Sequence, residues 1–403
     1  MGLIDFFRRV VTHAPAHSAV LSTGFASLSG LLLSLGVARA ASITEMGAFA
    51  VGFAGYALLL GLTQAMVAEP LAARLPDPLQ QGAGARQISS AAGLLGLLMA
   101  LLGLLTGNDY LAIAGIAAHG VCLANYTKNI TAVFGRPAFA VVQELARLLL
   151  FAGALAIPPV RESPLLLYGV WFYLYTAAGY VSTLLLRFDV RPRWRRPPVR
   201  WGESLSYGAE FLLGSGTTQI STFGLGAWAR PSVNAGLRGV GTLLGPVLTL
   251  TVSGRVLLIP FLSRSRAEQD SRGAAWRSTV ALLAVSVPAV LVINALPDAV
   301  LELALGDTWE VAAAILPIMS VEAVLALVST VPFAGHRSEG AHRRTVLLRA
   351  VVAPFRVAVI VLPGIWWGPV GAATGTLVAT VATTVLWWGS YLQLTRRHEG
   401  LTS

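Results

Sequence analysis

The basic residues of this chain alternate on and off between successive apolar runs, and this alternation constrains the fold more than any other feature. The 403 residues are 55% hydrophobic and only 12% charged, and many apolar runs are about as long as a helix that crosses a bilayer. Positive residues of membrane proteins gather in the cytoplasmic loops. The pattern therefore predicts an all-α integral membrane protein that crosses the membrane many times.

Apolar windows place twelve helices along the sequence, in two sets of six. A basic stretch, 187–203, separates an expected amino-terminal lobe, 1–186, from an expected carboxy-terminal lobe, 204–403. The fourth span is short, and polar residues begin within it at Asn125. The predicted spans are 19–37, 47–67, 88–106, 111–126, 138–157, 164–186, 205–225, 240–262, 279–296, 311–331, 347–365 and 370–392.

A charge census gives the orientation of these spans. With the amino terminus inside, 22 of the 29 Lys and Arg residues fall in inside segments and four fall in outside loops. Removing one helix from the middle would invert everything after it and destroy this alternation, so an even number of spans with both termini cytoplasmic is predicted. The three remaining basic residues, Arg147, Arg255 and Arg356, lie within spans.

The two halves also resemble each other in sequence. At a fixed offset of 190 residues, the stretch 35–74 matches 225–264 at eight of 40 positions, including glycine, proline and arginine. The repeat therefore matches the first and second helices with the seventh and eighth. Both helix pairs begin on the inside of the membrane. This predicts a parallel repeat, related by an axis along the membrane normal, as in several transporters.

Ionisable residues within the spans are the candidate functional residues. A charge near the bilayer centre costs about 2.5 to 3.5 kcal/mol on insertion scales, so these side chains should face the protein interior. They can serve substrate binding and gating, or pair with each other and lock helices together. Candidate substrate-binding residues are Arg147, Arg255 and Arg356; candidate gating or ion-coupling residues are Glu144, Glu210, Glu322 and His119.

Arg147 and Arg356 occupy equivalent helices, the fifth and the eleventh, of the proposed repeat. If both point into a cleft between the halves, they form a cationic centre suited to phosphate, since the guanidinium fork binds its oxygens in a bidentate way. Replacing either arginine by alanine should then abolish export of the phosphate-bearing substrate. Glu144 lies three residues before Arg147 and shares its helix face, so it can also simply neutralise that arginine. Arg255 lies nearer the cytoplasmic end and can snorkel to the interface.

Two further features allow both a functional and a structural interpretation. His119 can couple protons, or it can be a hydrogen-bonded packing residue. The seventh helix carries a polar stripe that can line a water-filled cavity or form a helix contact through hydroxyl groups. The stripe consists of Ser206, Glu210, Thr217 and Ser221.

Several classes of function are disfavoured. The net charge of +10 is scattered through short loops instead of forming a nucleic-acid-binding patch. A single cysteine, Cys122, excludes an internal disulfide. The sequence has no Walker loop, no metalloprotease histidine pair and no Gly-x-Ser-x-Gly elbow, so no catalytic residue, metal or cofactor is expected.

Short motifs resemble the multidrug/oligosaccharidyl-lipid/polysaccharide (MOP) exporter superfamily, particularly its Wzx-like polysaccharide flippase branch. The first helix pair is similar to the family's arginine and Gly-x-Phe pattern, and the second half is similar to its opening of helix eight and its Gly-x-x-Trp turn. The motifs are Ala38-Arg39-Ala40, Met46-Gly47-Ala48-Phe49-Ala50, Ala235-Gly236-Leu237-Arg238-Gly239, Leu244-Gly245-Pro246 and Leu305-Gly306-Asp307-Thr308-Trp309.

The resemblance implies two six-helix lobes around a cavity that opens alternately to each side, and an isoprenoid pyrophosphate-linked glycan moved to the outer leaflet of a bacterial plasma membrane. Carried over, the three intramembrane arginines would bind the pyrophosphate. Membrane lipids, the lipid-linked glycan and glycan-assembly enzymes are the implied partners. The chain lacks the two extra helices expected of lipid II flippases, which disfavours that branch.

Other functions stay open at this point. A drug or cation antiporter of the same fold would need unpaired carboxylates in its cavity, whereas buried arginines favour anions. A membrane glycan polymerase or ligase would need a substantial outside loop, and the longest candidate, 298–310, is short and acidic. A scaffold without transport activity is the remaining alternative.

Overall fold

The computed structural model describes residues 15–74, 77–134, 136–192, 194, 197–267 and 270–402. These ranges form helices joined by short connections, with no strand among them. The chain divides into two compact units, which end and begin at Thr222 and Phe223. This boundary falls within the helix α11 (Gly216–Trp228).

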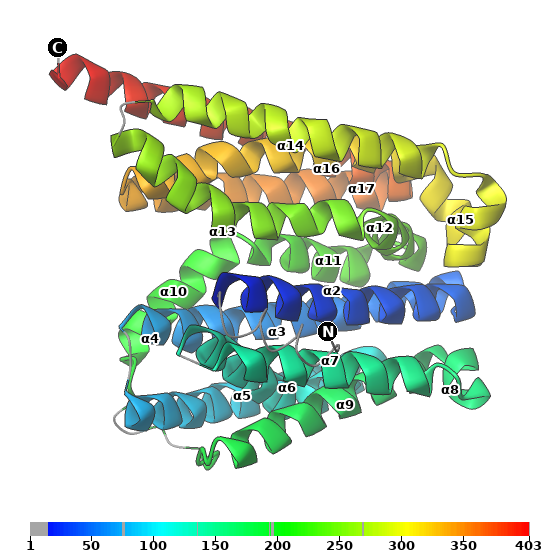
Figure 1. Cartoon of the computed structure of the whole chain (residues 1–403). Coiled ribbons are helices and arrows are strands. Elements are labelled where there is room, and N and C mark those ends of the chain that lie inside the picture. The colour runs from blue at the N-terminus through cyan, green and yellow to red at the C-terminus, as the bar shows by residue number, and fades with distance from the viewer. Residues whose placement is uncertain are drawn as a thin grey trace, which may run out of the picture. The chain divides into compact units, whose positions relative to one another are not determined.

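The first unit is organised around α6, which packs against α3, α5, α7 and α9 (Figure 1). The helix α2 lies against α7 and α9 on another side of the same unit. Its elements before α11 are α2 (Pro15–Ala40), α3 (Ile43–Thr63), the π-helix η1 (Gln64–Ala68), α4 (Glu69–Ala73), α5 (Pro78–Thr106), α6 (Asp109–Val133), α7 (Pro137–Ala154), α8 (Pro158–Glu162), α9 (Pro164–Leu185) and α10 (Trp201–Leu213).

The second unit is organised in a similar way around α16, which packs against α12, α13, α14 and α17 (Figure 1). Its elements after α11 are α12 (Pro231–Leu243), α13 (Gly245–Ala267), α14 (Ser271–Asn294), α15 (Asp298–Leu305), α16 (Thr308–Ser338) and α17 (His342–Thr402). The predicted fourth and tenth spans therefore lie in the helices that make the most extensive contacts in each unit.

Local sequence signals explain where several helices begin and end. Ser42 and Glu45 form a capping box before α3, in which each side chain accepts the other residue's backbone N–H. Proline stands in the first turn of α5, α7, α9 and α12, where its missing N–H costs nothing. Gly107 ends α5 in the left-handed conformation, with φ 68°.

The seventh and eighth predicted spans are each interrupted, whereas the sequence predicted continuous helices. Gly214, with φ −100° and ψ −100°, separates α10 from α11. Leu244 separates α12 from α13, directly before Gly245 and Pro246. Glycine adopts non-helical backbone angles at little cost, and proline lacks the N–H that would continue the hydrogen-bond ladder, so both breaks have local causes.

Among the residues that the structure describes, eight helices are long and apolar enough to cross a membrane. They are Leu21–Ala40, Ile43–Ala72, Pro78–Thr106, Pro137–Ala154, Pro164–Leu185, Ser271–Asn294, Thr308–Ser338 and Arg343–Arg396. The last range contains Gly368, which has φ 66° and ψ −147° and divides α17 into two helical pieces within the predicted loop between its two spans. The chain is thus a multi-pass helical membrane protein.

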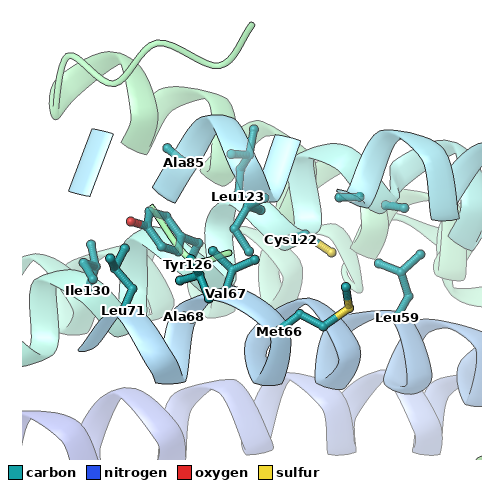
Figure 2. Close-up of a cluster of buried hydrophobic side chains, with 14 residues drawn as sticks. Leu59, Met66, Val67, Ala68, Leu71, Ala85, Cys122, Leu123, Tyr126 and Ile130 are labelled. Atoms are coloured by element: carbon teal, nitrogen blue, oxygen red, sulfur yellow. The ribbon is translucent and has the colours of Figure 1, made fainter. Parts of the chain in front are cut away.

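A buried apolar cluster joins α3, η1, α4, α5 and α6 in the first unit. Figure 2 shows Met66 and Val67 facing Cys122, Leu123 and Tyr126. Because the surrounding lipid is as apolar as these side chains, close van der Waals packing rather than the hydrophobic effect holds such helices together.

Glycines let the helices approach most closely where α6 crosses α9. A Cβ added at Gly179 of α9 would lie 2.0 Å from the carbonyl oxygen of Gly120 in α6. No real structure tolerates such a distance to backbone, so the two helices would have to separate. The packing of α6 against α9 therefore depends on this glycine.

Replacing Gly179 by alanine should lower the free energy of unfolding by about 1 to 3 kcal/mol, the cost of overpacking a well-packed contact. The measurement is unfolding of the purified protein in mixed detergent with increasing SDS. Gly169→Ala is the matched control, because it lies on the same helix and its added Cβ would meet nothing within 4 Å. Equal stability of the two variants would contradict this account of the contact.

Candidate functional site

A buried cluster of charges lies at the junction of α6 and α7 in the first unit. The Glu144 carboxylate is fully buried and accepts hydrogen bonds from Nε of Arg147 at 3.0 Å and from its Nη2 at 2.5 Å. Lys128 of α6 brings its Nζ within 3.4 Å of the other carboxylate oxygen. Two cations thus share one carboxylate, and the cluster carries a net positive charge.

Aromatic rings hold the guanidinium of Arg147 from α9. The Cζ atom of Arg147 lies 4.0 Å from the ring centre of Tyr175 and 5.2 Å from that of Trp171. Such cation–π contacts stabilise a desolvated cation by about 2 kcal/mol. The indole N–H of Trp171 in turn donates to Ser29 Oγ of α2 at 2.9 Å. The cluster therefore joins α2, α6, α7 and α9.

Arg147 is 3% exposed, and its Nη1 has no hydrogen-bond partner. The predicted pairing with Glu144 is present in the structure. A role for Arg147 in substrate binding stays a prediction. A buried charge whose partner is removed is strongly destabilising, so Glu144 is needed for the fold whatever else the cluster does.

Gln143 satisfies the neutral polar groups next to this cluster. Its Nε2 donates to the carbonyl of Ala124 at 2.8 Å, and its Oε1 accepts from Thr127 at 3.3 Å and from Ser182 at 3.1 Å. A buried polar network that is satisfied in this way fixes the register of its helices. Here it fixes α7 against both α6 and α9.

His119 of α6 is hydrogen-bonded through both ring nitrogens. Its Nε2 lies 2.7 Å from Ser89 Oγ of α5, and its Nδ1 lies 2.9 Å from the hydroxyl of Tyr180 of α9. Ser89 donates its own proton to the carbonyl of Val190. Since that carbonyl can only accept, a consistent assignment has Nε2–H donating to Ser89 and Tyr180 donating to Nδ1. His119 thus tethers three helices, and its coupling role stays a prediction.

The second unit holds a related arrangement on α16 and α17. Glu322 is 6% exposed and accepts a hydrogen bond from Thr380 Oγ1 at 2.8 Å. Arg356 lies on α17, the helix that packs against α16. Unlike Arg147, Arg356 is partly exposed, and its Nε is buried without a hydrogen-bond partner. Of these two arginines, Arg356 is thus the more accessible to a ligand.

The remaining predicted residues are placed as follows. Glu210 lies in the last turn of α10, partly exposed, directly before the break at Gly214. The stripe hydroxyl of Thr217 donates to the carbonyl of Gly214 at the helix break, and that of Ser221 donates to the carbonyl of Thr217 within α11. Arg255 lies on α13, and its side chain is outside the part that the structure describes.

Two polar features were missed by the sequence prediction. Lys128 was assigned to an inside loop, although it is the only lysine in a chain of 28 arginines, and it lies within α6. Gln64 is the first residue of the π-helical turn η1. Its Oε1 accepts a hydrogen bond from Asn125 Nδ2 at 3.4 Å, and its Nε2 donates one to Glu69 at 3.3 Å. Polar residues inside an apolar run were the available signal in both cases.

No group of His, Cys, Asp and Glu side chains in the described ranges could hold a metal ion. Cys122 is buried and receives a hydrogen bond from Thr63 at 3.4 Å. The polar chemistry described above is therefore that of paired charges and hydrogen bonds.

No family model matches the sequence, and no curated protein matches it. Solved structures, by contrast, match the fold along nearly its whole length. A lipid II flippase MurJ in an inward closed conformation has a TM-score of 0.69 and 11% identity, covering 93% of this chain and 89% of that chain. An inward-facing multidrug resistance MATE transporter of the MOP superfamily has a TM-score of 0.61 and 13% identity, covering 92% and 95%.

A third match is a MOP superfamily transporter from Pyrococcus furiosus Vc1 (DSM3638), described as having a binding pocket of reverse polarity that suggests a different function. Its TM-score is 0.60 at 13% identity, covering 96% of this chain and 98% of that chain. The predicted MOP exporter fold is confirmed by these matches. They do not distinguish the Wzx-like branch from the others.

Replacing Glu144 by glutamine should lower the free energy of unfolding by about 3 to 5 kcal/mol, because the buried Arg147 and the partly buried Lys128 lose their carboxylate. SDS-induced unfolding in mixed detergent measures this loss. Glu162→Gln is the matched control: Glu162 pairs with Arg161 at 3.5 Å on the surface, and its loss should cost less than about 1 kcal/mol.

The double variant Glu144→Gln/Arg147→Met should recover part of this loss, since it removes one of the stranded cations. If Glu144→Gln proves as stable as Glu162→Gln, the buried cluster does not stabilise the fold.

Proposed function

We propose that this chain, which has the fold of the MOP exporter superfamily, is a flippase that moves a lipid-linked oligosaccharide from the inner to the outer leaflet of a bacterial plasma membrane. The observation that carries the proposal is the whole-length match to membrane transporters combined with an arginine inside a predicted span of each unit, Arg147 in the first and Arg356 in the second. The reported solved structures are transporters or flippases, which supports a role other than catalysis.

The arginines support an anionic headgroup. Arg356 is partly exposed and has an unsatisfied buried Nε, so a phosphate oxygen could complete its hydrogen bonding. The Arg147 cluster contributes further positive potential, because Lys128 and Arg147 outnumber Glu144. An isoprenoid pyrophosphate would present phosphate oxygens to the protein while its tail stays in lipid.

We further propose twelve spans with both termini cytoplasmic, arranged as lobes 1–186 and 204–403 joined by the linker 187–203. The alternation of basic residues and the break of α17 at Gly368 support this topology. The interrupted segments α10–α11 and α12–α13 would each serve as one span, as discontinuous helices do in other transporters.

An antiporter for drugs or other organic cations is the alternative function. The match to multidrug resistance MATE transporters favours it, as does the carboxylate of Glu322 beside α17. Two observations weigh against it: Glu322 is buried and hydrogen-bonded to Thr380, and the intramembrane arginines would repel a cation.

Arg356→Gln should reduce glycan export at least ten-fold, because it removes charge-assisted hydrogen bonds to the headgroup. The measurement is accumulation of lipid-linked glycan in a cell whose own flippase is deleted and which expresses this chain. Arg356→Lys keeps the positive charge but lacks the two-pronged guanidinium group, so its glycan export should lie between that of the wild type and that of Arg356→Gln. Arg230→Gln, at an exposed position, is the control.

Failure of the wild-type chain to restore export with any glycan tested, together with accumulation of an organic cation, would overturn the flippase proposal. Normal export by a stable Arg356→Gln protein would instead remove Arg356 from the substrate site.

The topology is tested by cysteine labelling in cells, for which the buried native Cys122 gives a low background. A cysteine replacing Arg161 should react with a membrane-impermeant maleimide in intact cells. A cysteine replacing Arg191 should react only after permeabilisation. The reverse pattern would show that the orientation is inverted.

A further inference from the structure

The linker between the predicted lobes is fixed onto the first unit. Gln87 of α5 donates through Nε2 to the carbonyl of Val199 at 2.8 Å and accepts the Val199 N–H at 3.3 Å. The Val199 side chain is fully buried in the cluster of Figure 2, and Phe188 and Val190 pack against that cluster. The backbone of this stretch is therefore held against the first unit at Phe188, Val190 and Val199.

The acidic residues next to this stretch are already paired. Asp189 lies 3.9 Å from Arg86 and also accepts the backbone N–H of Arg191 at 3.0 Å. Glu203 of α10 forms an ion pair with Arg74, which also donates to the carbonyl of Pro198 at 3.1 Å. Neither carboxylate is left to neutralise the remaining arginines.

Three arginines here are exposed: Arg187, Arg191 and Arg200. In the part of the chain that the structure describes, none of the three makes an ion pair. The sequence adds Arg193, Arg195 and Arg196 to the same stretch. Arg187, Arg191 and Arg200 thus form a group of exposed positive charges without ion-pair partners among the described residues.

Arg187 holds an unfavourable backbone conformation. It follows the last turn of α9 with φ 55°, and no other described non-glycine residue has positive φ. The N–H of Phe188 bonds to the carbonyl of Thr183 at 2.9 Å, which is the helix ending at which glycine is preferred. Arginine costs about 1 kcal/mol more than glycine in this conformation. Position 187 thus carries an arginine side chain although its backbone conformation favours glycine.

Two tryptophans of this stretch stack on each other. The rings of Trp194 and Trp201 stack with centres 5.4 Å apart and planes 29° apart, and Trp201 Nε1 donates to the carbonyl of Trp194 at 3.2 Å. Trp194 is half exposed. Leu184 and Leu185, in the last turn of α9 just before Arg187, are strongly exposed and suited to lipid. Tryptophan prefers the boundary between acyl chains and headgroups.

We propose that the linker platform, defined as Arg187, Arg191, Trp194, Arg200 and Trp201, binds the headgroups of anionic phospholipids. Charge complementarity selects this occupant: exposed guanidinium groups without carboxylate partners stand beside indoles at headgroup depth, and a phosphate satisfies them in a bidentate way. The bound lipid is a constituent of the bilayer and distinct from the transported substrate, so the inference does not rest on the proposed function.

The test is lipid binding to the purified full-length protein, measured by native mass spectrometry with increasing phosphatidylglycerol or phosphatidylcholine. Each arginine near an anionic headgroup contributes about five-fold in affinity. Arg191→Gln/Arg200→Gln should therefore weaken phosphatidylglycerol binding by roughly 25-fold and leave phosphatidylcholine binding unchanged.

The matched control is Arg39→Gln/Arg161→Gln, which removes the same charge from exposed positions in the same unit. This control should keep its phosphatidylglycerol affinity within about two-fold. Equal losses in the two double variants, or equal affinity of the wild type for the two lipids, would overturn the proposal.

Arg187→Gly separates lipid binding from folding. Glycine should relieve the strained helix end, so the variant should unfold at the same or higher SDS concentration than the wild type. Its phosphatidylglycerol affinity should nevertheless fall about five-fold. A variant of unchanged phosphatidylglycerol affinity would remove Arg187 from the platform.

Discussion

A charge inside the hydrocarbon of a bilayer must find a partner within the protein, and the interior of each unit depends on this requirement. In the first unit, Glu144 neutralises Arg147 and also attracts Lys128. In the second, Glu322 accepts a hydrogen bond from Thr380. Because an unpartnered buried charge costs several kcal/mol, these pairs restrict how the helices that carry them can pack.

The two units meet this requirement on corresponding helices. In each unit, a carboxylate and an arginine lie among the helices predicted to be the fourth to sixth of a half: α6, α7 and α9 in the first, α16 and α17 in the second. The details differ, since Arg147 is enclosed by Trp171 and Tyr175, whereas Arg356 stays partly exposed. The first unit thus holds a closed cluster and the second a more open one, and the open one is better suited to a ligand.

Much of the fold was predictable, because apolar length and the positions of arginines report directly on membrane crossing. The helices and the proximity of Glu144 to Arg147 follow from apolar length and residue spacing, whereas the MOP fold was implied by the resemblance of short motifs to that superfamily. The helix breaks at Gly214 and Leu244 did not, since glycine and proline are common in membrane helices and only packing decides which of them interrupts the ladder. Lys128 was misplaced for a similar reason: the sequence shows its charge, while its partner comes from another helix.

Translocation of a lipid-linked glycan by the purified chain is the most direct measurement of the function we propose. Proteoliposomes would contain the lipid-linked oligosaccharide, and a glycosidase added outside would report how much of it reaches the outer leaflet. The fold and the intramembrane arginines predict that the protein makes the initially protected glycan accessible. If the glycan instead stays protected from the glycosidase and the vesicles accumulate an organic cation, the result would contradict a flippase and favour an antiporter.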